Sequence, residues 1–268
     1  MKESIKKIYH KLLNFFPKKM AHKILYYSVT KKKLNLDNPK DINEKIQWLI
    51  LNEYGTKEAK LTDKYLVREY VKEKGYERIL PKLIGVYSDV KEIDFEKLPS
   101  KFVLKTNNGS GDIFLCYDKQ NFNIELCKKT LKKNMKKDFS KEMQEYHYSL
   151  IEPKIVAEEY LEEDGMKNPL DYKIYCFNGK AECILLCSER EKKVRIDYYD
   201  LNWNYLDYSL PVYRSKNQYK KPEKLDEMIR IAEDLSRRNK ICKNGPVLCK
   251  WENLFWRNDI YTSMWYDK

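Results

Sequence analysis

The sequence predicts an α+β fold in which helices come first, β-hairpins follow and one further helix comes late. In the clearest hairpin, Asp171–Phe177 and Ala181–Cys187 flank the turn Asn178-Gly179-Lys180. Asn-Gly supplies the positive φ angles that a tight hairpin needs. After Pro222, apolar residues recur on one helical face, and proline is favoured at the start of a helix. Because helices and strands do not alternate, the pattern does not indicate a βαβ repeat.

Four earlier parts of the chain carry helical patterns. Apolar and basic positions alternate at helical spacing in Ile5–Lys31. A second helix is expected near Ile42, and a third opens at Thr62, whose side chain is a plausible N-cap. A basic amphipathic helical stretch spans Asn123–Tyr148. The first of these patterns makes residues 1–55 an N-terminal helical region.

Two strand predictions frame a glycine-containing loop. Phe102–Thr106 is a short apolar run that enters the loop, and Ile113–Tyr117 is its return strand. A further apolar run, Lys154–Leu161, ends in acidic residues and also reads as a strand. The domains expected from this order are a first subdomain over 56–153, a second over 154–237, and a separate tail over 238–268.

Composition narrows the class of protein. The chain has 268 residues, of which 42% are hydrophobic and 35% charged, so it is globular rather than disordered. No window holds the roughly 18 apolar residues of a membrane span, and no signal-peptide core is present, so we expect a cytoplasmic protein. Seven scattered cysteines and three distant histidines form no metal-ligand spacing, and no metal ligands are assigned.

A formal charge of +12 invites a nucleic-acid or membrane interpretation. The lysines are spread along the whole chain among 41 acidic residues, which favours a compositional bias and no nucleic-acid partner. A basic nucleic-acid binder stays as an alternative, and it predicts steeply salt-dependent DNA binding. In a weaker alternative, the segment His22–Lys33 binds the surface of an anionic bilayer.

The segment most informative about function is FVLKTNNGSGD, Phe102–Asp112. A strand reaches Lys105, and Asn108-Gly109-Ser110-Gly111 follows closely. Glycines let backbone N–H groups turn toward an anion, and the lysine adds a positive charge for phosphate. The loop is not a Walker A motif, and a strand rather than a helix follows it, which excludes the Rossmann pattern. Taken alone, such a loop is more often a simple hairpin turn.

The order of motifs along the chain resembles the TupA-like (teichuronopeptide-synthesis) ATP-grasp family over about residues 35–236. The fold this implies is an ATP-grasp fold, in which two α+β subdomains hold ATP between antiparallel sheets. The matching stretches are NPKDINEKIQWL (Asn38–Leu49), LTDKYLVREYV (Leu61–Val71), LPSKFVLKTNNGSGD (Leu98–Asp112), KIVAEEYL (Lys154–Leu161) and DYKIYCFNGKAE (Asp171–Glu182).

This resemblance implies roles for individual residues. Lys105 and Lys173 would bind ATP phosphates, and Gly109-Ser110-Gly111, with Asn108 beside it, would form a mobile flap. The backbone of Glu158-Glu159-Tyr160-Leu161 would meet the adenine. The remaining candidates are Glu163 or Asp164 for the ribose, and Arg190 for an acidic substrate or a phosphate. The alternatives are a solvated strand lysine for Lys173, a surface pair for Glu158-Glu159, and a structural ion-pair cluster for Asp63, Lys64 and Arg68.

The activity implied by the resemblance is ATP-dependent ligation of a carboxylate to an amine through an acyl phosphate. The implied partners are ATP, an amine such as an amino acid, and a carboxylated glycan or glycan precursor of the cell surface. Family members usually supply Mg²⁺ ligands from a late strand reading R-x-D and a following strand reading G-E. This chain has no such pair of strands, so both metal carboxylates are expected to be missing. Glu252, Asp259 and Asp267 remain in the tail, but nothing places them like the family's ligands.

The tail has an unusual tryptophan content, with Trp251, Trp256 and Trp265 among its last residues. Because tryptophan has the single codon TGG, reading one base later turns each into a glycine codon. With suitable synonymous codons at the other positions, the shifted frame can encode R-x-D, Asn-Gly and G-E. These motifs then stand at the spacing of two strands joined by a turn. We interpret the tail as the product of a frameshift near Arg237-Arg238, and we expect weak or no ligase activity from the chain as written.

Two other classes of function stay open beside a ligase. A non-catalytic nucleotide-binding remnant is favoured by the missing carboxylates. A glycosyltransferase of a surface-polysaccharide pathway would need an Asp-x-Asp metal motif after a strand, and the sequence has none.

Overall fold

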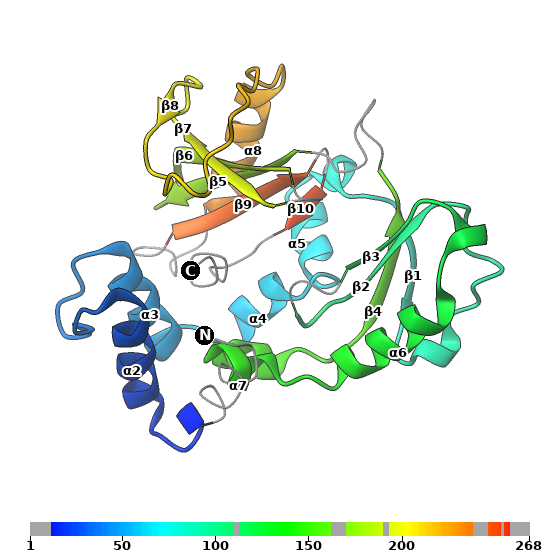
Figure 1. Cartoon of the computed structure of the whole chain (residues 1–268), viewed down its shortest axis with the longest axis horizontal. Helices are drawn as coiled ribbons and strands as arrows, with labels where there is room; N and C mark the ends of the chain where they lie inside the picture. The colour runs from blue at the N-terminus through cyan, green and yellow to red at the C-terminus, as the bar shows by residue number, and fades with distance from the viewer. Residues whose placement is uncertain are drawn as a thin grey trace. The chain divides into compact units, whose positions relative to one another are not determined.

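The computed structural model describes residues 12–109, 113–161, 170–189, 193–237, 246–252 and 255–257 (Figure 1). The chain forms two compact units. The first includes Met1–Tyr65 and Ile84–Ala157, and the second includes Leu66–Leu83 and Glu158–Ile260. A four-stranded sheet lies largely in the first unit and a six-stranded sheet lies in the second. The α+β class predicted from the sequence is confirmed.

The helix predicted near Ile42 is α3 (Ile42–Asn52), in the first unit. A capping box fixes its start, because the Asp41 carboxylate accepts the Glu44 N–H while the Glu44 side chain accepts the Asp41 N–H. Helix α2 (Lys18–Thr30) lies beside α3 (Figure 1).

The predicted helical stretch Ile5–Lys31 is not continuous within the described residues. The chain turns at Phe15 and Phe16, and Pro17 is the N-cap of α2. Proline is favoured at a helix start because it lacks an N–H and its φ is fixed. The prediction of one unbroken helix is therefore wrong at this point, and its residues 5–11 lie outside the described part.

Helix α4 (Thr56–Thr62) corrects the N-cap prediction, since Thr62 ends this helix instead of opening the next. The helix begins earlier because the Glu58 carboxylate accepts the Gly55 N–H at 3.0 Å and so caps the first turn. Helix α5 (Val67–Glu73) follows in the second unit.

The four-stranded sheet has the order β1-β4-β2-β3. Its strands are β1 (Leu83–Tyr87), β4 (Ile155–Glu159), β2 (Phe102–Thr106) and β3 (Ile113–Cys116). β2 and β3 pair antiparallel with Phe102 opposite Cys116, which confirms the predicted hairpin around the glycine loop. β1 had no counterpart in the sequence analysis.

The basic stretch after this hairpin is helical, although in shorter pieces than predicted. Its elements are α6 (Ile124–Met135), α7 (Phe139–Met143) and the 3₁₀ turn η4 (Tyr146–Leu150). Leu131 and Cys127 on α6 join the core beneath β2 and β4. The other 3₁₀ turns are η1 (Glu77–Ile79), η2 (Val90–Glu92) and η3 (Lys119–Asn121).

The six-stranded sheet has the order β10-β9-β5-β6-β7-β8. Its strands are β5 (Asp171–Phe177), β6 (Lys180–Ser188), β7 (Arg195–Tyr199), β8 (Tyr205–Leu206), β9 (Pro246–Glu252) and β10 (Phe255–Arg257). The predicted turn between β5 and β6 is confirmed, with φ of 52° at Asn178 and 77° at Gly179. Positive φ at both positions matches the twist of a hairpin.

The expectation that the tail contains no strands is wrong. β9 pairs antiparallel with β5 along its length, with Asp171 opposite Glu252 and Lys173 opposite Lys250, and β10 pairs with β9. Strand pairing is made by backbone N–H and C=O groups, so it does not require alternating side-chain polarity. The otherwise open edge of β5 offers those groups to the tail.

Helix α8 (Leu225–Ser236) covers one face of the six-stranded sheet (Figure 1). It starts three residues after Pro222, so the predicted first position is shifted. Its apolar side buries Leu225, Ile231 and Leu235, and Ile174 and Ile184 of the sheet are also fully buried. Among the described helices, none has both the length and the apolar composition of a membrane-spanning helix.

Candidate functional site

The loop after β2 contains the first group of predicted site residues. Lys105 lies half-buried on β2 opposite Ile113, and Asn108 and Gly109 follow the strand end. The order of strand, lysine, glycine loop and return strand is thus as predicted. Ser110 and Gly111 lie outside the described residues.

Asn107 holds the start of this loop, a role that the sequence analysis missed. Its side chain is fully buried; Nδ2 donates to Asp63 Oδ2 and to the Glu152 carbonyl, both at 2.9 Å. Its Oδ1 accepts the Lys154 N–H at 2.6 Å. One side chain therefore joins three segments of the first unit, and a satisfied buried amide of this kind fixes the backbone on both sides.

Lys64 contacts the same loop from the end of α4. Its Nζ donates to the Asn107 carbonyl at 3.4 Å and also to the Gly109 carbonyl. Asp63 and Lys64 therefore position the glycine loop, while Arg68 belongs to the second unit and contacts Glu158.

Glycine is required at position 109 for space. A Cβ atom there would lie 2.2 Å from Cε2 of Phe139, which is buried against Tyr148 and Ile151. Next to it, Asn108 is 4% exposed and its Oδ1 has no hydrogen-bond partner in the described part of the chain. The backbone of the loop at Gly109 therefore lies close to the Phe139 ring. Asn108 Oδ1 is a buried acceptor without a hydrogen bond in the described part of the chain.

The end of β4 contains the second group, Glu158-Glu159-Tyr160-Leu161. The surface-pair alternative is wrong for Glu158, which is 2% exposed and meets Arg68 Nη1 at 2.9 Å. Glu159 pairs with the backbone of Lys82, whose N–H donates to its carboxylate at 2.7 Å. The Arg68 ion pair therefore holds the Glu158 carboxylate inside the second unit.

Lys173 lies on β5, in the middle of the six-stranded sheet. It is 7% exposed, and it lies opposite Leu185 of β6 and Lys250 of β9. A solvated strand lysine is therefore the wrong description.

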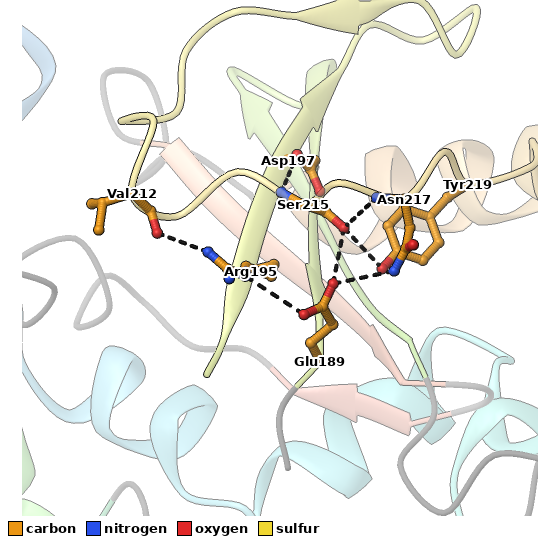
Figure 2. Close-up of polar contacts among 7 residues, drawn as sticks. All are labelled: Glu189, Arg195, Asp197, Val212, Ser215, Asn217 and Tyr219. Atoms are coloured by element: carbon orange, nitrogen blue, oxygen red, sulfur yellow. Dashed lines mark hydrogen bonds and ion pairs between the residues drawn. The ribbon is translucent and has the colours of Figure 1, made fainter. Parts of the chain in front are cut away.

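The predicted residue Arg190 lies outside the described residues, as do Glu163 and Asp164. The neighbouring Glu189 belongs to a polar cluster beside β7 (Figure 2). Its carboxylate accepts from Ser215 Oγ at 3.1 Å and from Asn217 Nδ2 at 3.2 Å, and it pairs with Arg195 Nε at 3.5 Å. The residue has a φ of 53°, an unusual conformation for a non-glycine residue.

Asp197 lies in the same cluster and is 2% exposed. Its Oδ1 accepts the Ser215 N–H at 3.2 Å, while its Oδ2 has no partner among the described residues. Burial raises the pKa of the Asp197 carboxyl, the Ser215 hydrogen bond opposes this, and the Glu189 charge adds to it. The folded protein therefore binds the proton of this carboxyl group more tightly than the unfolded chain does.

We expect Asp197→Asn to stabilise the protein by roughly 1 kcal/mol at neutral pH, because it removes a buried charge that lacks full compensation. A raised folded pKa means that the contribution of Asp197 to wild-type stability is greatest below the unfolded pKa of 3.8 and is lost as pH rises through the folded pKa. The advantage of the variant should therefore disappear near pH 4 in urea unfolding.

A matched control lies three residues along the chain. Hydrogen bonds from Asn204 lower the pKa of Asp200, so Asp200→Asn should lower stability at neutral pH. If both variants changed the stability at neutral pH in the same direction, the assignment of Asp197 as an insufficiently compensated buried charge would be contradicted.

Among the side chains of the described residues, no group of three or more His, Cys, Asp or Glu could hold a metal ion. No step is therefore assigned to a metal on these residues.

Fold and site together define an ATP-grasp protein, with two α+β units that each carry a strand lysine in an antiparallel sheet. A family model described as TupA-like ATPgrasp matches residues 44–243. The chain belongs to the TupA-like ATP-grasp family. A comparison with curated protein sequences gave no match.

Several solved ligase structures are similar to the chain at low identity. D-alanine–D-alanine ligase from Bacillus anthracis is 17% identical, with 74% of this chain and 55% of that chain covered and a TM-score of 0.38. Carboxyaminoimidazole ribonucleotide synthase from Aspergillus clavatus complexed with ATP is 11% identical, with 74% and 44% covered and a TM-score of 0.40. Phosphoribosylamine–glycine ligase from Thermotoga maritima is 15% identical, with 79% and 51% covered and a TM-score of 0.41. The chain spans about half the length of these structures.

Proposed function

We propose that this chain is an ATP-dependent carboxylate–amine ligase by descent, acting in the cytoplasm on a carboxylated glycan or precursor of the cell surface. Membership of the TupA-like ATP-grasp family supports the ligase class. The surface-glycan acceptor and the amine donor follow from the family resemblance, as does the link to teichuronopeptide synthesis.

The observation that supports nucleotide binding most directly is the burial of Lys173, which is 7% exposed on β5 of the second unit. A lysine ammonium in this setting stabilises a phosphate oxygen through a charge-assisted hydrogen bond. We assign Lys105 and Lys173 to the ATP phosphates. The glycine loop, residues 109–111, would cover them, and the backbone of Glu158–Leu161 would meet the adenine.

The reaction proceeds in two steps in this proposal. A carboxylate oxygen of the acceptor attacks the γ-phosphorus of ATP, which gives an acyl phosphate and ADP. The amine nitrogen then attacks the acyl carbon, phosphate leaves, and the amine loses a proton to give the amide. The two lysines stabilise the negative charge on the transferring phosphoryl group and on the departing phosphate. Arg190 is proposed for the acidic substrate.

We infer that the activity of this chain is impaired. Mg²⁺ would supply the main charge neutralisation at the phosphates, and the tail as written has no strand reading R-x-D followed by a strand reading G-E, from which the family usually supplies its ligands. The frameshift stays a prediction about the tail. The same observation favours the second candidate, a nucleotide-binding protein that binds ATP without turning it over.

The test compares Lys173→Met with Lys180→Met by calorimetric titration with ATP. Lys180 is the matched control, because it lies on the same hairpin but is exposed and contacts only Glu233 at 3.6 Å in the described part. We expect Lys173→Met to weaken ATP binding about tenfold or more, and Lys180→Met to change it by less than about twofold. Equal affinities for both variants would remove Lys173 from the site.

A second readout separates the two candidates. Hydroxylamine traps an acyl phosphate as a hydroxamate, so a carboxylate-dependent hydroxamate supports the ligase. ATP binding without ADP release under any acceptor supports the non-catalytic candidate, and no ATP binding by the wild-type chain contradicts both.

A further inference from the structure

The outward side of α2 combines apolar and basic side chains. Ala21, His22 and Tyr26 are buried against the first unit. The residues at the opposite helical positions are exposed, with Met20 at 49% and Tyr27 at 55%. The exposed lysines of this side are Lys19, Lys23 and the C-cap residue Lys31.

The turn that precedes α2 extends this surface with further apolar side chains. Phe15 is 86% exposed, Leu12 is 54% exposed and Phe16 is 44% exposed. Soluble proteins rarely leave several large apolar side chains exposed next to one another in sequence, and such a patch marks a site of interaction. We call residues 12–31 on this outward side the α2 surface.

The charge of this part of the chain has a single sign. Between Glu3 and Asp37 the sequence contains nine lysines and no acidic residue. One exposed ion pair offsets this positive charge slightly, because Lys19 Nζ lies 3.9 Å from the Asp37 carboxylate. Exposed pairs of this kind contribute little to stability. The α2 surface is therefore matched to an anionic partner.

We propose that the α2 surface docks on an anionic lipid bilayer and holds the protein at the membrane face. Aromatic and aliphatic side chains such as Phe15 and Met20 enter the boundary between headgroups and acyl chains. The lysines at their margins reach the lipid phosphates, with their methylene stems along the apolar region. This inference does not depend on the ligase assignment.

Two other occupants fit the surface less well. A second copy of the chain would bring the lysines of both surfaces together, and like charges oppose such a contact. A nucleic acid would satisfy the lysines and stack on aromatic rings, but Leu12 and Met20 present no ring to a base. Of these three occupants, the bilayer is the one that uses both the aliphatic and the cationic side chains.

The test is flotation of the full chain with vesicles of pure phosphatidylcholine and with vesicles that also contain about 30% phosphatidylserine. We expect binding to the anionic vesicles alone, and weaker binding at high salt. The variant Lys19→Gln, Lys23→Gln, Lys31→Gln should lose most of this binding. Phe15→Ser with Met20→Ser, which keeps the charge, should also lower bound protein several-fold.

The matched control removes the same charge from another exposed basic helix. Lys129, Lys132 and Lys133 lie on α6, and their triple change to Gln should leave vesicle binding within about twofold. Equal loss in both triple variants would overturn the proposal, because binding would then depend on net charge alone. The proposal also fails if the Phe15/Met20 variant binds like wild type.

Two further results would assign the surface to a different partner and so overturn the proposal. One is a dimer in light scattering that the Phe15/Met20 variant converts to a monomer. The other is single-stranded DNA that displaces the protein from vesicles at equal phosphate concentration. Circular dichroism and the thermal midpoint of each variant must match wild type, since these exposed positions make no core contact.

Discussion

Replacing Arg68 by Met is expected to destabilise the second unit by about 3–5 kcal/mol in urea unfolding at neutral pH. Both members of the Arg68–Glu158 ion pair are buried, with 7% and 2% of their surfaces exposed, and their atoms meet at 2.9 Å. Arg68 Nη2 also donates to the Pro81 carbonyl at 2.6 Å. Methionine fills the volume but removes the cation, so the buried Glu158 carboxylate loses its guanidinium.

The control for this prediction is Arg78→Met. Arg78 and Glu227 form an ion pair of similar length, 2.7 Å, in the same unit, but their side chains are 62% and 36% exposed. Solvent screens such a pair, so its loss should cost less than about 1 kcal/mol. Comparable losses for Arg68→Met and Arg78→Met would contradict the assignment of a buried pair.

The double variant Arg68→Met, Glu158→Gln separates the cost of the isolated charge from lost packing. Removing both charges should recover part of the stability that Arg68→Met loses, because a neutral amide is far less costly to bury than a carboxylate. A double variant no more stable than Arg68→Met would place the effect in packing around the arginine side chain.

Local features of the fold were predictable from the sequence because local geometry determines them. The Asn178-Gly179 turn needs positive φ at both positions, and the structure has it. The β2–β3 hairpin followed from two short apolar runs around a glycine loop. Thr62 was placed wrongly because the actual cap, Glu58 on the Gly55 N–H, starts the helix a turn and a half earlier.

Features that depend on distant pairs were not predictable. Arg68 and Glu158 are 90 residues apart, and no pattern in one sequence joins them. Asn107 joins segments more than 40 residues away on either side, yet it reads as an ordinary turn residue. The strand β9 was missed because pairing with β5 is a property of backbone groups, which side-chain alternation does not report.

The candidate site also combines features that the sequence predicts with features that only the structure shows. Motif order pointed to Lys105 and Lys173, but only the structure shows that Lys173 is 7% exposed. The order of motifs along the chain does not report this burial, because burial depends on how distant segments pack around the strand.

The second large expected effect is a loss of stability at low pH, and it arises from the buried side chain of His147. The ring is 1% exposed, and neither of its nitrogens has a hydrogen-bond partner in the described part of the chain. It packs against Tyr54, with ring centroids 5.2 Å apart, and against Tyr148, at 4.8 Å. Burial lowers the pKa of His147 from 6.5 to about 4.

The sign follows from proton binding in the two states. Above pH 6.5 the imidazole is neutral in the folded and in the unfolded state, so its contribution to the free energy of unfolding does not change with pH. Between 6.5 and about 4 the unfolded chain binds a proton that the folded protein excludes, so stability falls as pH falls. The loss approaches about 3 kcal/mol and levels off below the folded pKa.

The variant His147→Phe isolates this term, because it keeps an aromatic ring in the cavity and removes the titrating group. We expect it to be at least as stable as wild type at pH 7, since it also removes two buried polar atoms that lack hydrogen bonds. At pH 4.5 its advantage should grow by about 2.5 kcal/mol in urea unfolding.

Taking the difference between the two proteins at each pH removes contributions that both share. One is His22, whose pKa burial also lowers while bonds to Gln47 and the Gln144 carbonyl oppose the shift. A difference that stays constant from pH 7 to pH 4.5 would mean that the His147 ring is charged or hydrogen-bonded in the folded protein. A difference that grows on acidification would identify the buried imidazole as an acid-sensitive point of the first unit.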